Sequence, residues 1–203
     1  MLVLHHFPRG EYVPSSDGRI VLHQVSWSQY ETQLEIRGDR SSPRISYLDG
    51  AMELMSPSKD HERIKSYIGR LVETFALEHD IDFSPYGSWT LKEAPKGAGV
   101  EPDECYLFGS DQSREMPDLV IEVIWTSGGI DKLEAYRRLG VSEVWFWKND
   151  AIQVHVLEAD AYQTSERSRC LPGLDLALML SCVREPTVLQ AVKALRIALG
   201  VTR

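Results

Sequence analysis

Apolar residues recur along this chain with a helical period in some segments and as unbroken or alternating runs in others. Residues 59–80 carry them three and four positions apart, the spacing of one buried helix face. A shorter helix is expected to begin after Ser26, a good capping residue, and to end at Gly38. The stretches "GIDKLEAYRRLG" and "EPTVLQAVKALRIALG" predict two further helices, the first of which ends at Gly140.

Extended segments lie between these helices. "PRISYLDGAMELMSP" has two extended runs around Asp49 and Gly50, a pair that favours the tight turn of a β-hairpin. "DLVIEVIW" is almost continuously apolar, as in central strands covered on both faces, and "SEVWFWKN" and "AIQVHVLE" are expected to pair across a short turn. Shorter strands are expected over 81–91 and in "VEPDECYLF". The order of elements therefore predicts an α/β fold with a mixed central β-sheet flanked by helices.

The length and composition of the chain favour a single domain. Its 203 residues, 43% of them hydrophobic, can bury one sizeable core, and no repeat or linker divides two patterned halves. No run approaches the roughly 18 apolar residues of a membrane helix, and the first residues do not resemble a secretory signal. We therefore expect a cytoplasmic protein that does not enter a membrane.

The charge of the chain narrows the classes of partner. A net charge of -8 and a pI of about 5.3 argue against binding of long nucleic acids through a broad basic surface. Clustered acidic residues can instead be metal ligands, and local basic patches can still occur on an acidic protein. The three cysteines form no CxxC pair, so neither a disulfide framework nor a zinc knuckle is indicated.

The stretch "PDLVIEVIWTSGGIDKLEAY" places charges around an apolar strand, where they need partners or a metal. Alternate side chains of a strand share a face, so Glu122 points to the same side as Asp118 and Val120. Asp103 precedes Glu122 by 19 residues, and adjacent strands can bring these two together. Two converging carboxylates repel unless a cation lies between them, and their oxygens suit Mg²⁺ or Mn²⁺. The alternative is that Glu122 pairs with an arginine or lysine.

Lys132 opens the helix that follows this strand. Its stem can lie along the helix face that packs on the sheet, so its amine can reach back toward Glu122. The alternative is a surface lysine paired with Asp131 or Glu134. Asp118 lies four residues from Glu122, roughly 13 Å along a strand, so we expect it to fix the preceding loop and not to share a metal.

Four sequence motifs follow one another over roughly residues 43–157: "YLDGAMELMSPSKDHE", "EPDE", "PDLVIEVIWTSGGIDKLEAY" and "LGVSEVWFW". Together they resemble the Uma family of restriction endonucleases, within the PD-(D/E)XK nuclease superfamily. The resemblance implies a restriction-endonuclease-like core, dependence on Mg²⁺, and hydrolysis of phosphodiester bonds in DNA. The single nuclease-like domain over 1–203 then has an N-terminal extension with a short helix (1–42), a core (43–157) and a C-terminal extension (158–203).

Site residues follow from the resemblance position by position. Asp103 looks like the metal-binding aspartate of the superfamily and Glu122 like its second acidic ligand, and Val123 can add its backbone carbonyl. The superfamily pattern has a lysine two residues after the glutamate, where this chain has Ile124. The family shows the same departure, with a lysine in the following helix that Lys132 matches.

Two further positions come from "DGAMELMSPSKDHE". Many relatives carry an acid directly after the hairpin glycine, where this chain has Ala51; Glu53, two residues on and on the same face, is taken as the third acidic member. A half-exposed strand glutamate is the alternative. His61 begins the buried face of the long helix and is a candidate for ligand orientation or proton transfer. The alternative is a histidine at the start of the helix with a structural role alone.

Three functions remain open at this stage. The first is a Mg²⁺-dependent endonuclease acting on DNA. The sequence does not reveal the oligomeric state, but from the resemblance alone a homodimer is a reasonable expectation, because nucleases that cut both strands often pair two active sites. The second is a non-catalytic module that keeps the fold and binds a partner or regulates it. The third is hydrolysis of RNA or of a small phosphoester by the same site.

Overall fold

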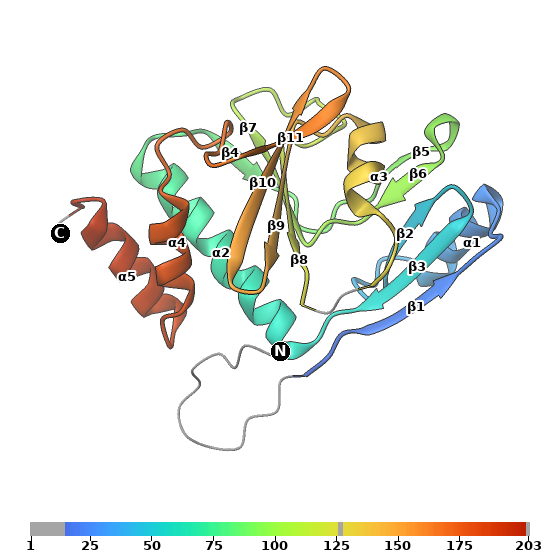
Figure 1. The fold of residues 1–203 in the computed structure, drawn as a ribbon, viewed down its shortest axis with the longest axis horizontal. Coiled ribbons are helices and arrows are strands. Elements are labelled where there is room, and N and C mark those ends of the chain that lie inside the picture. The colour runs from blue at the N-terminus through green and yellow to red at the C-terminus, as the bar shows by residue number, and fades with distance from the viewer. Residues whose placement is uncertain (1–14, 126–127, 202–203) are drawn as a thin grey trace.

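A computed structural model describes residues 15–125 and 128–201, and these form two β-sheets and five α-helices (Figure 1). The larger sheet has six strands in the order β11-β10-β9-β8-β7-β4. Only β8 and β9 pair in parallel among them, and the other neighbours are antiparallel. The strands are β4 (Phe83–Pro85), β7 (Glu104–Phe108), β8 (Leu119–Val123), β9 (Glu143–Lys148), β10 (Ala151–Glu158) and β11 (Ala161–Ser165).

The smaller sheet is antiparallel and has five strands in the order β1-β3-β2-β6-β5. They are β1 (Gly18–Leu22), β2 (Arg44–Leu48), β3 (Ala51–Ser56), β5 (Leu91–Glu93) and β6 (Ala98–Val100). Asp49 and Gly50 join β2 to β3 with φ angles of 46° and 85°. Two consecutive positive φ angles are what a tight hairpin turn requires, so the predicted hairpin is confirmed.

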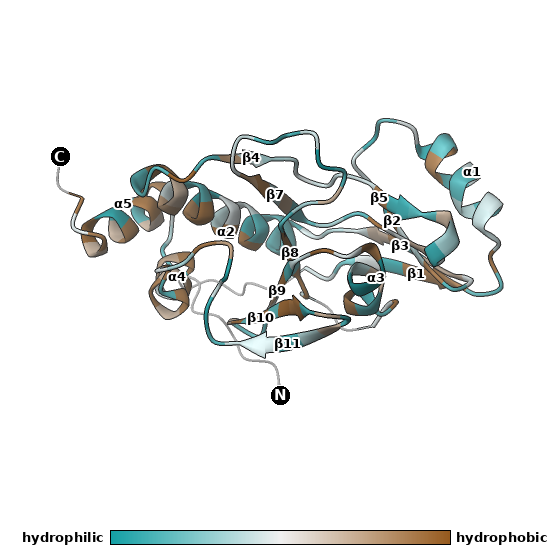
Figure 2. Ribbon diagram, turned by 90° about the horizontal axis from the view of Figure 1, so that it is seen from above, coloured by the Kyte–Doolittle hydropathy of each residue, from teal (hydrophilic) through white to brown (hydrophobic). Residues whose placement is uncertain are grey.

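Helices cover both faces of the larger sheet (Figures 1 and 2). α2 (Lys59–Glu78) packs against one face and is backed by α4 (Leu176–Val183) and α5 (Val188–Ala198). α3 (Lys132–Leu139) covers the other face and also contacts β5 and β6, so it lies between the two sheets. α1 (Trp27–Arg37) packs on the smaller sheet. None of the helices in the described ranges is long and apolar enough to span a membrane.

β8 is the central strand that its apolar run predicts. All five of its residues are buried, and it lies between β7 and β9. Leu119, Ile121 and Val123 join the core on the α2 side, whereas Val120 joins the core on the α3 side. The predicted alternation is therefore confirmed, and it directs Glu122 toward α3.

Candidate active site

Glu122 lies near the end of β8 with its carboxylate held from α3. The residue is 2% exposed, and Lys132 Nζ donates to its Oε2 at 2.7 Å. The hydroxyl of Tyr136 donates to the other oxygen, Oε1. Lys132 and Tyr136 are four residues apart and therefore lie on one face of α3, one turn from each other. The reach of Lys132 back to the strand, expected from the sequence, is present in the structure.

Tyr136 also belongs to this site, although the sequence analysis does not single it out. It is completely buried, and burial together with the nearby charge of Glu122 raises its pKa well above the usual value of 10.0. The hydroxyl therefore keeps its proton and acts as a donor to the carboxylate. Its position four residues after Lys132, on the strand-facing side of the helix, is the signal that identifies it.

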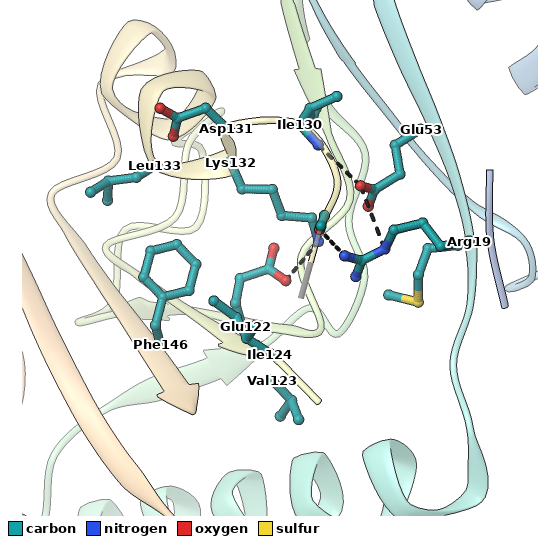
Figure 3. Close-up of a pocket in the computed structure, with 12 residues that line it drawn as sticks. Arg19, Glu53, Glu122, Val123, Ile124, Ile130, Asp131, Lys132, Leu133 and Phe146 are labelled. Carbon is teal, nitrogen blue, oxygen red and sulfur yellow. Dashed lines mark hydrogen bonds and ion pairs between the residues drawn. The ribbon is translucent and has the colours of Figure 1, made fainter. Parts of the chain in front are cut away.

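A cavity of about 240 Å³ opens beside this pair, and Figure 3 shows side chains from both sheets around it. Glu122 and Lys132 line it together with Glu53 of β3 and Arg19 of β1. Glu53 and Arg19 face the larger sheet because alternate residues of their strands, such as Ile20, point the other way. The smaller sheet thus supplies one acid and one base to the same cavity.

Glu53 is 2% exposed, so it is not a half-exposed strand residue. Its Oε2 accepts a hydrogen bond from the backbone N–H of Ile130 at 3.2 Å, and Arg19 Nε lies 3.7 Å from the same oxygen. The Arg19 guanidinium also donates through Nη1 to the carbonyl of Gly128. Arg19 was not identified from the sequence, because it lies on a strand that the apolar pattern does not predict.

Asp103 is fully buried directly before β7. β7 and β8 pair with Glu104 opposite Ile121, so the same register brings Asp103 next to Glu122 along the strand pair. Its Oδ2 accepts a hydrogen bond from the backbone N–H of Val123 at 2.6 Å. Asp103 and Glu122 are therefore neighbours through Val123, as the sequence predicts for their strands, although Asp103 does not line the cavity.

The other oxygen of Asp103 faces two basic side chains. Arg44 contacts Oδ1 through its guanidinium, and His61 Nε2 lies 2.9 Å from the same atom. The opposite ring nitrogen of His61 lies 3.1 Å from Asp17 Oδ2. His61, in the first turn of α2, is completely buried and bridges two carboxylates, which agrees with its expected orientation toward the sheet.

Asp17 belongs to the segment before β1 and was missed by the sequence reasoning, which found no pattern there. Burial raises the pKa of this carboxyl, but hydrogen bonds from His61 and from the backbone N–H of Ser58 outweigh that effect and lower it to about 2. Asp17 is thus ionised at neutral pH and holds the imidazole of His61 in place.

The donor chemistry of the cavity can be compared with the needs of a hard divalent cation. Within the described residues, no three Asp, Glu, His or Cys side chains gather closely enough to form a metal site. In the same part of the chain, Glu53 Oε1 is buried without a hydrogen-bond partner, and Glu122 lines the same cavity. Carboxylate oxygens of this kind are what Mg²⁺ and Mn²⁺ prefer. In donor type these residues suit such a cation, but only Glu53 and Glu122 are reachable from the cavity, because Asp103 is engaged by Arg44 and His61.

Asp118 lies outside this arrangement. Its Oδ2 accepts a hydrogen bond from the N–H of Phe108 at 2.7 Å, and its Oδ1 pairs with Arg114. It fixes the segment before β8, which is the role expected from its spacing.

Similarity to known proteins bears on the family and the fold of this chain. A family model described as "Uma2: Putative restriction endonuclease" matches residues 27–185. A solved structure described as a "putative nuclease belonging to DUF820", from Anabaena variabilis ATCC 29413, aligns with a TM-score of 0.52 at 11% identity, covering 79% of this chain and 96% of that one. The likeness bears on fold alone, and with the family match it confirms the predicted restriction-endonuclease-like α/β fold. No curated protein matches the chain.

Proposed function

Because the chain belongs to the Uma2 family, we propose that it is a Mg²⁺-dependent endonuclease that hydrolyses phosphodiester bonds in DNA. One observation carries the proposal: the Lys132 amine lies 2.7 Å from the carboxylate of Glu122, although the two residues come from a helix and a strand. Hydrolysis of a phosphodiester needs a positioned water and positive charge near the phosphate. Glu122 and Lys132 line the same cavity, and their carboxylate and ammonium are groups suited to these two tasks.

Glu122 and Glu53, with Asp103 and the backbone carbonyl of Val123, are the groups that would hold Mg²⁺ or Mn²⁺, which would supply an acidified water and neutralise charge on the phosphate. Lys132 is 14% exposed, so its ammonium acts in a partly desolvated space where charge interactions are strong. Its role is to hydrogen-bond the attacking water or a phosphate oxygen. Tyr136 keeps Glu122 in orientation while Lys132 turns toward the substrate.

Asp103 receives its orientation from the other side. The N–H of Val123 fixes one oxygen, and Arg44 and His61 fix the other. His61 in turn is held by Asp17. Of the two expected roles of His61, we therefore assign it the orientation of Asp103 and not proton transfer. Both of its ring nitrogens face carboxylates, and His61 does not line the cavity.

The test is nicking of supercoiled plasmid by the purified protein in Mg²⁺ or Mn²⁺. Lys132→Met is expected to lose at least about 100-fold in rate, the loss typical of one electrostatic group in an active site. Lys65→Met is the matched control, since Lys65 is 19% exposed and pairs with glutamates away from the cavity. Absence of nicking of any DNA form with either ion, or full activity of Lys132→Met, refutes the proposal.

A second candidate is a non-catalytic module that binds or regulates a partner. It is favoured by the pairing of Asp103 with Arg44 and His61, and because no three metal-ligating side chains gather at one point within the described residues. Titration calorimetry with Mn²⁺ separates the two candidates. A nuclease site binds the ion and releases or absorbs heat, whereas a site whose acids are paired with the protein's own cations gives no heat of binding. A panel of DNA, RNA and small phosphoesters then identifies the substrate class, and sedimentation tests the expected homodimer.

A further inference from the structure

α3 bridges the two sheets, so its position bears on the geometry of the cavity. Glu53 comes from the smaller sheet, whereas Glu122 comes from the larger sheet and is held by Lys132 of α3. The helix also packs on β5 and β6 of the smaller sheet through a shared apolar core. The separation of the two glutamates across the cavity therefore depends on how α3 is fixed to the smaller sheet.

Arg138, in the last turn of α3, binds the turn that joins β2 to β3. Its guanidinium donates to the two carboxylate oxygens of Asp49, at 2.7 Å and 2.6 Å, and to the carbonyl of Lys96 at 3.1 Å. A pair of parallel hydrogen bonds of this kind fixes orientation as well as distance. The hydrogen bonds from Arg138 lower the pKa of Asp49 below its usual value of 3.8, so this pair is charged at neutral pH.

A second contact joins α3 to the same hairpin at the other end of the helix. The N–H of Ile130, just before α3, donates to Glu53 of β3 at 3.2 Å (Figure 3). Asp49 and Glu53 are separated by roughly 13 Å at the rise of a strand. Ile130 and Arg138 are separated by roughly 12 Å at the rise of a helix. Because the two lengths nearly match, both contacts can hold α3 in one position on the smaller sheet.

We propose that Arg138 and Asp49 are positioning residues, which fix α3 on the smaller sheet and so set the separation of Glu53 from Glu122 across the cavity. The inference rests on the proposed function, because it gives this pair an effect on catalysis. Neither residue of the pair lines the cavity, so both act only through α3 and β3. The alternative is that the apolar core and the contacts of Glu53 hold the helix by themselves.

Amide hydrogen exchange followed by NMR measures this positioning in the protein without metal or DNA. Arg138→Gln removes the guanidinium, and Asp49→Asn removes the charge but keeps a residue type that tolerates the positive φ of the turn. In both variants the amide of Ile130 is expected to exchange at least about ten-fold faster, because its hydrogen bond to Glu53 opens more often. The amide of Val123, whose partner directly precedes β7, is the internal reference and should exchange as in the wild type.

Arg137→Gln is the matched control. Arg137 lies beside Arg138 in the last turn of α3, is 30% exposed against 26%, and also pairs with Glu134. Its other partner is Asp160, between β10 and β11 of the larger sheet. The control therefore removes the same charge from the same helix without touching the smaller sheet, and the exchange of the Ile130 amide should not change.

Plasmid nicking in Mn²⁺ measures the consequence for catalysis. Asp49→Asn and Arg138→Gln should each lower kcat at least about ten-fold with little change in KM, because a displacement of about 1 Å in an active site can cost about 100-fold. The double variant should lose no more than either single variant, since the two residues act as one unit. Arg137→Gln should keep the wild-type kcat.

The outcomes separate the two proposals. If the wild type nicks DNA but both variants keep its kcat, or if the Ile130 amide exchanges equally fast in all of them, the positioning role is refuted and the nuclease function stands. The pair is partly exposed, so its loss should cost little stability; if Arg138→Gln nevertheless does not fold, Asp49→Asn decides by the same criteria. If the wild type nicks no DNA, the proposed function fails and the effect of the pair on catalysis fails with it, whereas hydrogen exchange still shows whether the pair fixes α3.

Discussion

Tyr136→Phe tests the hydrogen bond that holds Glu122. The change removes one hydroxyl and keeps the ring, which is fully buried in the core between α3 and the larger sheet. The hydroxyl donates to a carboxylate that is 2% exposed, so no water readily replaces it. A hydrogen bond to a charged group contributes about 1.5–3 kcal/mol. We therefore expect the free energy of unfolding to fall by about 2 kcal/mol, which lowers Tm by about 4–8 °C in a chain of this size.

Tyr162→Phe is the matched control. The Tyr162 hydroxyl donates to the neutral carbonyl of Val141 at 2.7 Å, and its ring packs against the same core. A neutral hydrogen bond contributes about 1 kcal/mol, so this variant should lose about half as much stability. Urea unfolding followed by circular dichroism measures both, with equal m-values showing that only stability has changed. A loss in Tyr136→Phe no larger than that in Tyr162→Phe refutes the reasoning.

The same pair of variants tests whether Tyr136 matters for catalysis. At 25 °C both should be folded, so any difference in plasmid nicking reports the orientation of Glu122. We expect a lower kcat for Tyr136→Phe and an unchanged kcat for Tyr162→Phe. Full activity in a destabilised Tyr136→Phe would show that the hydroxyl stabilises the fold and does not prepare the site.

Three further predictions concern charged residues. The pKa of Asp17 is lowered to about 2 from 3.8, so its contribution to stability is present above about pH 4 and is lost as the pH falls toward 2. The difference in unfolding free energy between the wild type and Asp17→Asn should therefore shrink over that range, and a constant difference would contradict this. Arg37→Leu leaves Glu101, which is 1% exposed, without its bidentate partner. The free energy of unfolding in urea should therefore fall by about 3–5 kcal/mol, and a fall below about 1 kcal/mol would contradict this. Mn²⁺ should raise the Tm of the wild type by binding the folded state and raise that of Glu53→Gln less, whereas an equal rise would exclude Glu53 as a ligand.

Elements with strong local signals could be predicted from the sequence. α1 begins after Ser26, which caps it, and ends at Gly38, both as expected. β1 was missed because its apolar residues do not mark its buried face: Ile20 and Leu22 are 60% and 43% exposed, whereas the charged Arg19 is half-buried. α4 has a nearly continuous apolar sequence without a helical period, and β11 is a mostly polar edge strand, so neither shows a pattern. The division into a core and two extensions stays a prediction.

The candidate site was predictable to the extent that its contacts are local. The pairing of Lys132 with Glu122 follows from strand alternation and helix periodicity, which act over ten residues. The contacts of Asp17 with His61 and of Arg44 with Asp103 join residues far apart in the chain, and no spacing rule connects them. These partners depend on how two sheets and a helix pack together, which is information that a single sequence does not display.

The placement of Lys132 on α3 determines how its pair with Glu122 is assembled. Where a lysine stands two residues after the glutamate, the backbone of one strand keeps both on the same face. Here Lys132 and Glu122 meet only while α3 is docked between the sheets. For the proposed nuclease, heating is therefore expected to abolish plasmid nicking when that helix detaches, before the β-sheet signal is lost, so the nicking rate would report whether this short helix is docked.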